Sequence, residues 1–482
     1  MSIDPRPVLY IVGIFLCVLA ITMAIPAAID IYDAHDDWKA FAISMGLSGF
    51  TGVLLILSNR QRQIKITGRQ AFLLTALSWF ALCFFSCLPF MFALPDITFT
   101  NAMFEAVSGL TTTGSTIMTS LDSMPRGLLM WRSLLQWLGG VGIIVMAISI
   151  LPFLKVGGMQ LFRLESSEKE KAMANATQLS KYIIYIYAAL TAFCAISYIY
   201  VGFTPFDAIA HAMTTIATGG FSTHDASFSN YMTHGPAIVA IIFMLLGCLP
   251  FVLYIKCLHG SWSHILQDEQ VRAFFKIVIF SIAILVSFLV AHNHDFSMDT
   301  VISTAFTTIA LLTGTGYSTI DYMVWGGFAV GFLLFLSAIG GCAGSTTCGI
   351  KIFRFQILYC VAKNQVQQLI HPRGVFTIDY NKQPLTVNVA ASVMAYFFIF
   401  TASYVLVSIG LLACGLDILT SLSGAMTTLA NVGPGLGDII GPSGTFEPLP
   451  DNAKWIMIVS MLLGRLEFFT LLVFFSPRFW KH

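Results

Sequence analysis

Charged residues are scarce in this chain, and their scarcity decides its broad class. Only 10% of the 482 residues are Asp, Glu, Lys or Arg, whereas 57% are hydrophobic. A soluble domain carries roughly 25% charged residues. The net charge is +1, so no basic surface favours nucleic acid as a partner. The composition indicates a polytopic protein of the lipid bilayer with no sizeable soluble domain.

Enzyme signatures and metal-ligand spacings are also missing. The sequence has no HExxH, no GxSxG and no paired carboxylates inside an apolar run, and its ten cysteines form no CxxC pair. Most of these cysteines stand in apolar runs, where a buried small side chain is the ordinary interpretation. We therefore expect no enzymatic activity, no disulfide framework and no covalently bound cofactor.

Long apolar runs are abundant, and ten of them approach or exceed the roughly 20 residues that cross a bilayer. The first run follows a segment with Asp4 and a single arginine, unlike the start of a signal peptide, so we expect a retained helix. The ten predicted spans are Val8–Ile29, Lys39–Leu57, Ala71–Ala93, Met130–Leu151, Tyr182–Val201, Ala237–Cys257, Phe274–Ala291, Trp325–Cys360, Ala390–Cys414 and Trp455–Phe475.

The loops between these spans alternate in charge. Lys and Arg gather in Arg60–Arg69, Lys155–Lys181, Lys256–Lys276 and Lys351–Lys382, and in the C-terminal tail. Basic loops face the cytoplasm in membrane proteins. This pattern predicts a multi-pass membrane protein with both termini cytoplasmic.

Four short segments resemble one another, and each ends in a glycine-containing turn. They are AVSGLTTTGST (Ala106 to Thr116), AMTTIATGGFST (Ala212 to Thr223), AFTTIALLTGTGYST (Ala305 to Thr319) and AMTTLANVGPGLG (Ala425 to Gly437). Each lies in a helical stretch of about 10 to 14 residues, too short to cross. Capping residues mark their expected starts: Thr100, Asp207, Asp299 and Asp417. The alternative is that the loops are ordinary surface turns after short interfacial helices. Such turns would not need the similar AMTT or AFTT sequence that precedes three of these loops.

The repeating unit is therefore a span, a half-helix, a Thr/Gly loop and a second span. We predict an all-α polytopic membrane fold with four direct repeats around a pseudo-fourfold axis, preceded by two N-terminal helices. The predicted boundaries are residues 1–69 for those helices, then 70–155, 156–260, 261–382 and 383–482 for the repeats.

Irregular backbone at membrane depth is tolerated only where it is buried in protein or lines water. Four such loops indicate a shared axis, on which half-helix C-termini contribute negative charge and carbonyl oxygens replace the hydration shell of a cation. Gly114, Gly220 and Gly433 align eight residues after the shared alanine, and the third repeat carries an insertion that leaves Gly314 and Gly316 as alternatives. The remaining predicted ring residues are Thr112, Thr113, Thr218, Gly219, Thr315, Asn431 and Val432.

Two features are candidates for a gate below this ring. Arg465 lies near the middle of a span, where a cation is costly unless its surroundings are polar. It either projects into the pore or forms a structural salt bridge with another span. The second candidate lies in the 36-residue run Trp325–Cys360, which is longer than one crossing requires. The residues in its middle are small and polar. This stretch either breaks the span into an intramembrane loop or packs closely against another helix through Gly340 and Gly344. The residues of this candidate loop are Gly340, Gly341, Gly344, Ser345, Thr346, Thr347 and Gly349.

Two titratable residues lie on the half-helices. His211 is expected to be packed or hydrogen-bonded rather than part of a proton relay. Glu105 either enriches cations at the outer mouth or solvates its half-helix.

The four loops, together with GRLEFFT (Gly464 to Thr470), resemble the bacterial Trk/Ktr and plant HKT superfamily of potassium transporters over nearly the whole chain. The resemblance implies uptake of potassium as the transported ion, a homodimer, and a cytosolic ring of TrkA-type nucleotide-binding subunits. It implies gate roles for Arg465 and Gly340–Gly349. It also implies sodium permeation where the residue at Gly114 is serine.

Two other classes of function compete with a gated potassium pathway. A proton- or sodium-driven symporter typically shows inverted or twofold repeats, whereas this chain has four direct ones. A membrane enzyme ranks last, because no catalytic constellation is present.

Overall fold

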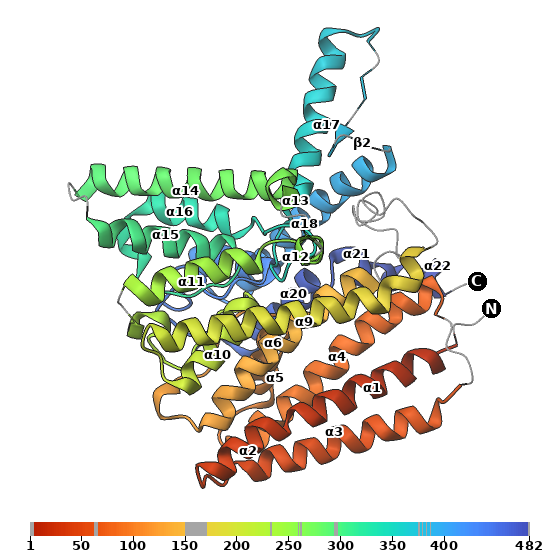
Figure 1. The fold of residues 1–482 in the computed structure, drawn as a ribbon, viewed down its shortest axis with the longest axis vertical. Coiled ribbons are helices and arrows are strands. Elements are labelled where there is room, and N and C mark those ends of the chain that lie inside the picture. The colour runs from red at the N-terminus through yellow and green to blue at the C-terminus, as the bar shows by residue number, and fades with distance from the viewer. Residues whose placement is uncertain are drawn as a thin grey trace.

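The computed structural model describes residues 4–61, 66–149, 171–231, 234–258, 260, 263–293, 297–374, 376–377, 379–381, 383–385 and 387–480. Within these residues the protein is helical, apart from a hairpin of β1 (Asp379–Tyr380) and β2 (Gln383–Pro384). The predicted all-α class is confirmed. The two ends of the chain lie together on one side of the helical assembly (Figure 1).

Two N-terminal helical segments pack at one edge of the molecule. α1 (Arg6–Thr22) continues into α2 (Ala24–Tyr32), and α3 (Trp38–Ser58) runs back beside them (Figure 1). The two helices approach closely at Gly13, where a Cβ would lie 2.7 Å from the carbonyl oxygen of Gly52. Small residues allow such contact, which favours helix association in lipid.

Each of the four repeats contains a long first helix, a half-helix and a second helix. The first helices are α4 (Gly68–Ala93), α9 (Lys171–Tyr200), α14 (Glu269–Asn293) and α18 (Val387–Ala413). The half-helices are α5 (Phe99–Leu110), α10 (Pro205–Ile216), α15 (Met298–Leu312) and α19 (Ile418–Ala430). The second helices begin with α6 (Arg126–Ser149), α11 (His234–Gly247), α16 (Gly327–Ser337) and α20 (Asp451–Arg465).

Three of the second helices are interrupted. α11 and α12 (Phe251–Leu258) meet at 91°, with Pro250 just before α12. α16 is separated from α17 (Ile352–Ile370) by a non-helical stretch, as predicted. The predicted span Trp455–Phe475 is sharply bent, because α20 and the next helix meet at 110° and Glu467 between them has φ 57°. That next helix comprises α21 (Phe468–Leu472) and η4 (Val473–Phe475).

Among the residues that the structure describes, six helices are long and apolar enough to cross a membrane, and up to eight spans result if each of two bent pairs counts as one. Two further predicted spans correspond to helices outside this set. Met130–Leu151 corresponds to α6 as far as Ser149, and the last two residues of that prediction lie outside the described residues. Within Trp325–Cys360, α16 has only 11 residues.

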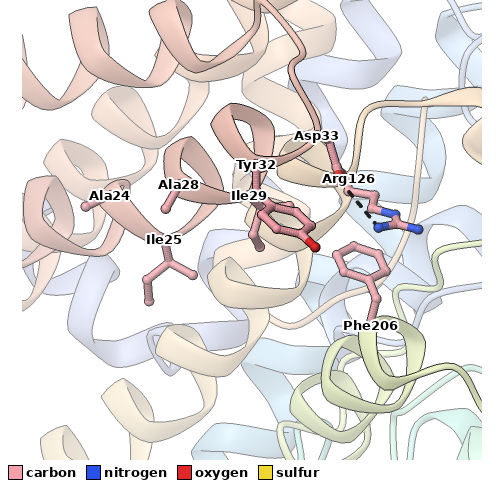
Figure 2. A pocket seen from close by; sticks show the side chains of 8 residues that line it. All are labelled: Ala24, Ile25, Ala28, Ile29, Tyr32, Asp33, Arg126 and Phe206. Atoms are coloured by element: carbon pink, nitrogen blue, oxygen red, sulfur yellow. Dashed lines mark ion pairs between the residues drawn. The ribbon is translucent and has the colours of Figure 1, made fainter.

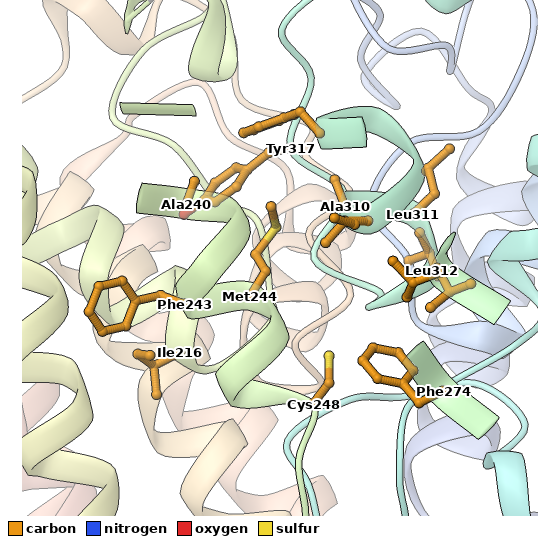
Figure 3. Close-up of a cluster of buried hydrophobic side chains, with 14 of the residues drawn as sticks. Ile216, Ala240, Phe243, Met244, Cys248, Phe274, Ala310, Leu311, Leu312 and Tyr317 are labelled. Carbon is orange, nitrogen blue, oxygen red and sulfur yellow. The ribbon is translucent and has the colours of Figure 1, made fainter. Parts of the chain in front are cut away.

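Apolar side chains cover the outside of the bundle as well as its interior. Phe50, Phe193 and Phe398 are 67%, 64% and 75% exposed, which suits contact with lipid. Inside, one buried cluster joins the N-terminal helices to α5, α6 and α20, and another joins α9 to α16. Figure 3 shows part of the second cluster, where Met244 of α11 lies near Ala310 of α15.

Short elements complete the chain. α17 and the β-hairpin project away from the main bundle (Figure 1). Tyr380 of the hairpin packs in a small buried cluster with Phe353 and Ile357 of α17. The other short helices are η1 (Leu121–Ser123), η2 (Ser227–Tyr231), α13 (Ser263–Gln267), η3 (Tyr322–Trp325) and α22 (Pro477–Trp480).

Candidate functional site

The half-helices begin at capping side chains and end at the four Thr/Gly loops. The side chains that cap them belong to Thr98, Thr204, Ser297 and Asp417, each of which accepts a backbone N–H from the residue three positions on. The expected cap Asp417 is confirmed. Thr100, Asp207 and Asp299 lie in the first turns instead, because an equally good capping residue precedes each of them and hydrophobic periodicity does not fix a helix start to within two residues.

The four loops meet edge to edge in a closed ring. A Cβ at Gly114 would overlap the carbonyl of Gly219, and one at Gly220 would overlap the carbonyl of Thr315. A Cβ at Gly316 would lie 2.8 Å from the nitrogen of Gly433, and one at Gly433 would lie 3.2 Å from the carbonyl oxygen of Gly114. The contact order is thus first, second, third, fourth and back to first, with no room for a Cβ at the first three junctions and a tight fit at the fourth.

The backbone of the loops repeats as well. Each loop has a residue with positive φ just after its half-helix: Thr112 (55°), Thr218 (51°), Gly314 (75°) and Asn431 (53°). Two residues later, Gly114, Gly220 and Gly316 have φ of 87°, 78° and 76°. On this pattern Gly316 corresponds to Gly114 and Gly220, whereas Gly314 corresponds to Thr112 and Thr218.

The insertion in the third repeat lies in its half-helix. α15 has 15 residues, whereas α5 and α10 have 12 each and α19 has 13. Nearly one extra helical turn therefore precedes the third loop. The sequence AFTT around Ala305 is consequently out of register with the corresponding AMTT segments, although it resembles them.

Threonine hydroxyls pair within two of the loops. The hydroxyls of Thr111 and Thr113 are 2.7 Å apart, and those of Thr313 and Thr315 are 2.8 Å apart. The first and third loops, which lie across the ring from each other, thus each contain one such threonine pair.

Loops one and four are joined directly. Ser115 Oγ donates to the carbonyl oxygen of Gly433 over 2.8 Å, and Asn431 Nδ2 donates to Thr113 Oγ1 over 2.9 Å. Asn431 Nδ2 also donates to the carbonyl oxygen of Met461 in α20, over 2.9 Å. These bonds fix the left-handed backbone at Asn431.

On one side the ring opens into a cavity of about 80 Å³, which we call the outer cavity. Its lining includes Gly114, Gly220, Gly316 and Gly433, one residue from each loop. Arg132, His224 and Asp225 supply its charged groups.

The predicted gate loop lies against the other side of the ring. Thr346 Oγ1 donates to the carbonyl oxygen of Gly247 over 3.0 Å and is 3.3 Å from Thr218 Oγ1. Cys348 Sγ is 3.5 Å from Thr112 Oγ1. A Cβ at Gly314 would lie 3.8 Å from the backbone nitrogen of Cys348. The loop therefore contacts the first three ring segments at their left-handed residues.

The rest of the gate loop is held internally and at its base. Ser345 Oγ is 2.7 Å from Thr347 Oγ1, which accepts the N–H of Gly341 over 3.1 Å. Gly344 and Gly349 adopt φ of 76° and 72°. The N–H of Gly340 donates to the carbonyl oxygen of Ile350 over 2.9 Å and closes the base.

Arg465 bonds to the gate loop and is 3% exposed. Its Nη1 donates to the carbonyl oxygen of Thr346 over 3.4 Å and to Cys348 Sγ, and its Nη2 donates to the carbonyl oxygen of Gly139 over 2.8 Å. Among the described residues no carboxylate lies within ion-pair distance of Arg465. These residues therefore supply no partner for the alternative interpretation of Arg465 as part of a structural salt bridge. Two separately predicted gate features are thus in contact.

Comparison with protein families classifies the chain. The family model TrkH, described as "Cation transport protein", matches residues 37–482, which include α3 and all four repeats. The chain belongs to the TrkH family.

Several relatives cover this TrkH-family chain almost completely. The Trk system potassium uptake protein TrkI of Halomonas elongata is 43% identical over 477 residues, 98% of this chain and 97% of the relative. TrkH of Escherichia coli strain K12, a Trk system potassium uptake protein, is 35% identical over 482 residues, 99% of each chain. The crystal structure of the potassium transporter TrkH from Vibrio parahaemolyticus matches with a TM-score of 0.92 at 35% identity, covering 99% of this chain and 100% of that one.

Glu105 does not face the mouth in this TrkH-family protein, and the idea that it enriches cations there is wrong. Its side chain is fully buried and accepts from Arg132 Nε over 2.8 Å and from the N–H of Ile117 over 3.0 Å. Arg132 also donates to the carbonyl oxygen of Ser222 over 2.8 Å. This pair joins α5, α6 and the second loop. Its arginine lies 27 residues from Glu105, so no local pattern marked it.

His211 is buried and hydrogen-bonded, as predicted. Nδ1 lies 2.9 Å from the carbonyl oxygen of Asp207, and Nε2 lies 3.1 Å from Ser222 Oγ. It supports the second loop from behind.

A second buried arginine was not singled out from the sequence. Arg354, in the first turn of α17, donates to Glu467 Oε2 over 2.9 Å and lies 3.7 Å from the centre of the Tyr396 ring. Glu467 is the bend residue between α20 and α21. The pair therefore connects the helix after the gate loop to the bend after Arg465.

Acidic groups surround His224 beside the outer cavity. Its Nδ1 lies 2.5 Å from Asp122 Oδ1, and its Nε2 lies 3.7 Å from Asp207 Oδ2. The nearby carboxylate of Asp207 is the main reason why the pKa of His224 rises to about 9, and Asp122 adds to it. A protonated His224 therefore joins the segments that follow the first and second loops.

A larger groove lies away from the ring. Figure 2 shows it between α2 and Phe206 of α10, with a volume of about 560 Å³. Arg126 and Asp33 face each other at one end, 3.5 Å apart. None of the candidate ring or gate residues lines this groove.

Proposed function

We propose that this protein takes up potassium ions across the bacterial inner membrane through a filter of backbone carbonyls. The observation that carries the proposal is the closed ring of four loops, each at the C-terminus of a half-helix. Half-helix C-termini favour a cation there, and loop oxygens replace its water shell. The relatives' names as potassium uptake proteins support the choice of ion.

The proposed filter comprises three residues of each loop. Gly316 is chosen over Gly314 as the partner of Gly114 and Gly220, because its positive φ and its contact with Gly433 follow the same pattern. Gly314 stays in the filter as the residue two positions earlier. The filter residues are Thr112, Thr113, Gly114, Thr218, Gly219, Gly220, Gly314, Thr315, Gly316, Asn431, Val432 and Gly433.

The loop Gly340–Gly349 and Arg465 form the proposed gate. The loop lies against ring residues on the side opposite the outer cavity, so an ion that leaves the filter meets it. Arg465 places a positive charge beside the same loop. Movement of the loop opens the path, and the arginine opposes passage while the path is closed.

Membership of the TrkH family supports a proposal for assembly and regulation. We propose a homodimer in the bilayer, with both termini in the cytoplasm and TrkA-type nucleotide-binding subunits on the cytosolic face. Exposed Lys363 and Arg373 lie on or next to α17, which projects from the bundle (Figure 1). This projecting segment is the proposed docking face.

Uptake in a potassium-dependent strain tests this function. A bacterium without its own potassium uptake should grow at limiting potassium when it expresses this chain together with a cytosolic Trk partner. Purified protein in liposomes should admit ⁸⁶Rb⁺ in preference to ²²Na⁺. Equal entry of both ions, or no growth despite normal amounts of protein in the membrane, would contradict the proposal.

An ion-coupled symporter is the competing mechanism. Its signature is potassium accumulation that follows a proton or sodium gradient when the membrane potential is clamped at zero. Channel-like flow responds only to the potassium gradient and the potential.

A further inference from the structure

One side-chain amide bonds to the second loop on both sides of Gly220. Gln136 of α6 is fully buried. Its Nε2 donates to the carbonyl oxygen of Gly219 over 2.7 Å, and its Oε1 accepts the N–H of Phe221 over 3.0 Å. These bonds hold the residues on both sides of Gly220. Because a carbonyl only accepts and a backbone N–H only donates, the amide fits in one orientation.

The second loop leaves space for this amide only because residue 219 is glycine. A Cβ at Gly219 would lie 2.4 Å from the Gln136 side-chain carbon, so only glycine leaves room for it. Gly220, between the two bonds, has φ 78°. The carbonyl of Gly219 also borders Gly114 of the first loop, so the amide fixes a junction between two ring segments.

Neighbouring positions of α6 extend the same support. Arg132, one turn earlier, donates to the carbonyl oxygen of Ser222 over 2.8 Å, and Gly139, three residues later, accepts from Arg465 over 2.8 Å. One face of α6 therefore contacts the second loop and, below it, the gate arginine.

We infer that Gln136 is a positioning residue that sets the ion selectivity of the filter, an inference that rests on the proposed potassium pathway. Selectivity of a carbonyl ring depends on where its oxygens stand and how firmly they are held. Gln136 fixes the Gly219 carbonyl from behind while its second lone pair stays free. It does not touch the ion.

Two substitutions separate positioning from folding. Gln136→Glu keeps the size and the acceptor for Phe221 but removes the donor to Gly219, whereas Gln136→Leu removes both bonds. The matched control is Ser133→Ala on the same helix, because Ser133 is also buried and its hydroxyl bonds only within α6, to Leu129. Each protein, in full-length form, is reconstituted in liposomes, and ⁸⁶Rb⁺ and ²²Na⁺ influx are measured together.

We expect the rubidium-to-sodium influx ratio to fall roughly two- to tenfold in both Gln136 variants, the effect of one hydrogen bond, and to stay unchanged in Ser133→Ala. An unchanged ratio in Gln136→Glu at matched protein content overturns the inference, as does a loss of total influx without a change of ratio. Failure of the proposed function has a different signature, since the unmodified protein would then not prefer rubidium to sodium.

Discussion

At the residue scale, the ring tolerates backbone angles that most side chains avoid. Thr112, Thr218 and Asn431 are non-glycine residues with positive φ at equivalent places, and such conformations cost about 1–3 kcal/mol each. Surrounding bonds, such as those of Asn431 to Thr113 and Met461, offset that cost. Repetition of the strain in three loops indicates that the ring geometry is selected for its function.

Replacing Gly114 tests the ring. Gly114→Ser should lower the potassium-over-sodium preference, because its Cβ would displace the Gly219 carbonyl. It should also reduce stability by about 1–3 kcal/mol through its φ of 87°. Paired ⁸⁶Rb⁺ and ²²Na⁺ uptake and thermal unfolding in detergent measure the two effects.

Gly326→Ser is the control for strain alone. Gly326 has φ 91° and nothing within 4 Å of its Cβ position. This variant should lose stability and keep its selectivity. If both variants retain the preference for potassium, the filter assignment of Gly114 is wrong.

The His224 cluster predicts a dependence of stability on pH. The pKa of His224 rises from 6.5 to about 9 in the folded protein, so folding is favoured while the group is protonated in the native state. This contribution is fully present below about pH 6.5 and is lost as the pH rises through about 9. The thermal midpoint should fall over this interval, and less so in His224→Asn. An identical pH profile for that variant would refute the assignment.

At the scale of elements, the buried pair of Glu105 and Arg132 joins a half-helix to α6. Glu105→Gln leaves an uncompensated buried guanidinium and should destabilise the protein by about 3–5 kcal/mol. The exposed pair of Lys39 and Asp36 supplies the comparison, because Asp36→Asn removes only a solvent-screened ion pair and should leave the stability almost unchanged. Thermal unfolding in detergent ranks them, and similar losses in both would contradict the role of burial.

The gate predicts how flux depends on charge at Arg465. Arg465→Gln and Arg465→Ala should raise influx several-fold, because the positive charge beside the ion path is gone, whereas Arg465→Lys should keep it low. Liposome influx at matched protein content measures this. Equal influx in the Lys and Gln variants would show that the bonds to Thr346 and Gly139, rather than charge, restrict flow.

Deleting the gate loop tests the other half of the gate. Removal of Gly340–Gly349 takes away the segment that contacts Thr112, Thr218 and Gly314. The shortened protein should leak potassium whether or not its partner is present. Control of flux that persists without the loop would reject its role.

The half-helices and loops could be predicted because their signals are local: a cap, a short apolar stretch, threonines and glycine. The break at Gly340–Gly349 was visible for the same reason. The 110° bend at Glu467 was hidden in an apolar run, and the extra turn of α15 was hidden by a chance likeness of AFTT to AMTT. Contacts such as Gln136 with Gly219 join residues 83 positions apart, and no spacing in one sequence reveals them.

At the scale of the whole molecule, the ring lies where two cores meet. One core is built mainly from the N-terminal helices and the first and fourth repeats, and the other mainly from the second and third. The bonds of Gln136 and Arg132 to the second loop cross between these halves. A relative shift of the two halves would therefore be transmitted to the proposed filter through α6, and to the proposed gate through Gly139 and Arg465.

The projecting α17 gives the last prediction, which concerns regulation of the assembled system. Reversing the charge of Lys363 and Arg373, both exposed, should abolish stimulation of uptake by a cytosolic TrkA-type partner and leave partner-free uptake unchanged, because neither residue contacts the ring. The control reverses Arg6 and Arg60, which are exposed at helix ends on the same predicted face. Rubidium uptake with and without partner distinguishes the two pairs. Stimulation that survives at Lys363 and Arg373, or is lost equally in both pairs, would place the docking face elsewhere.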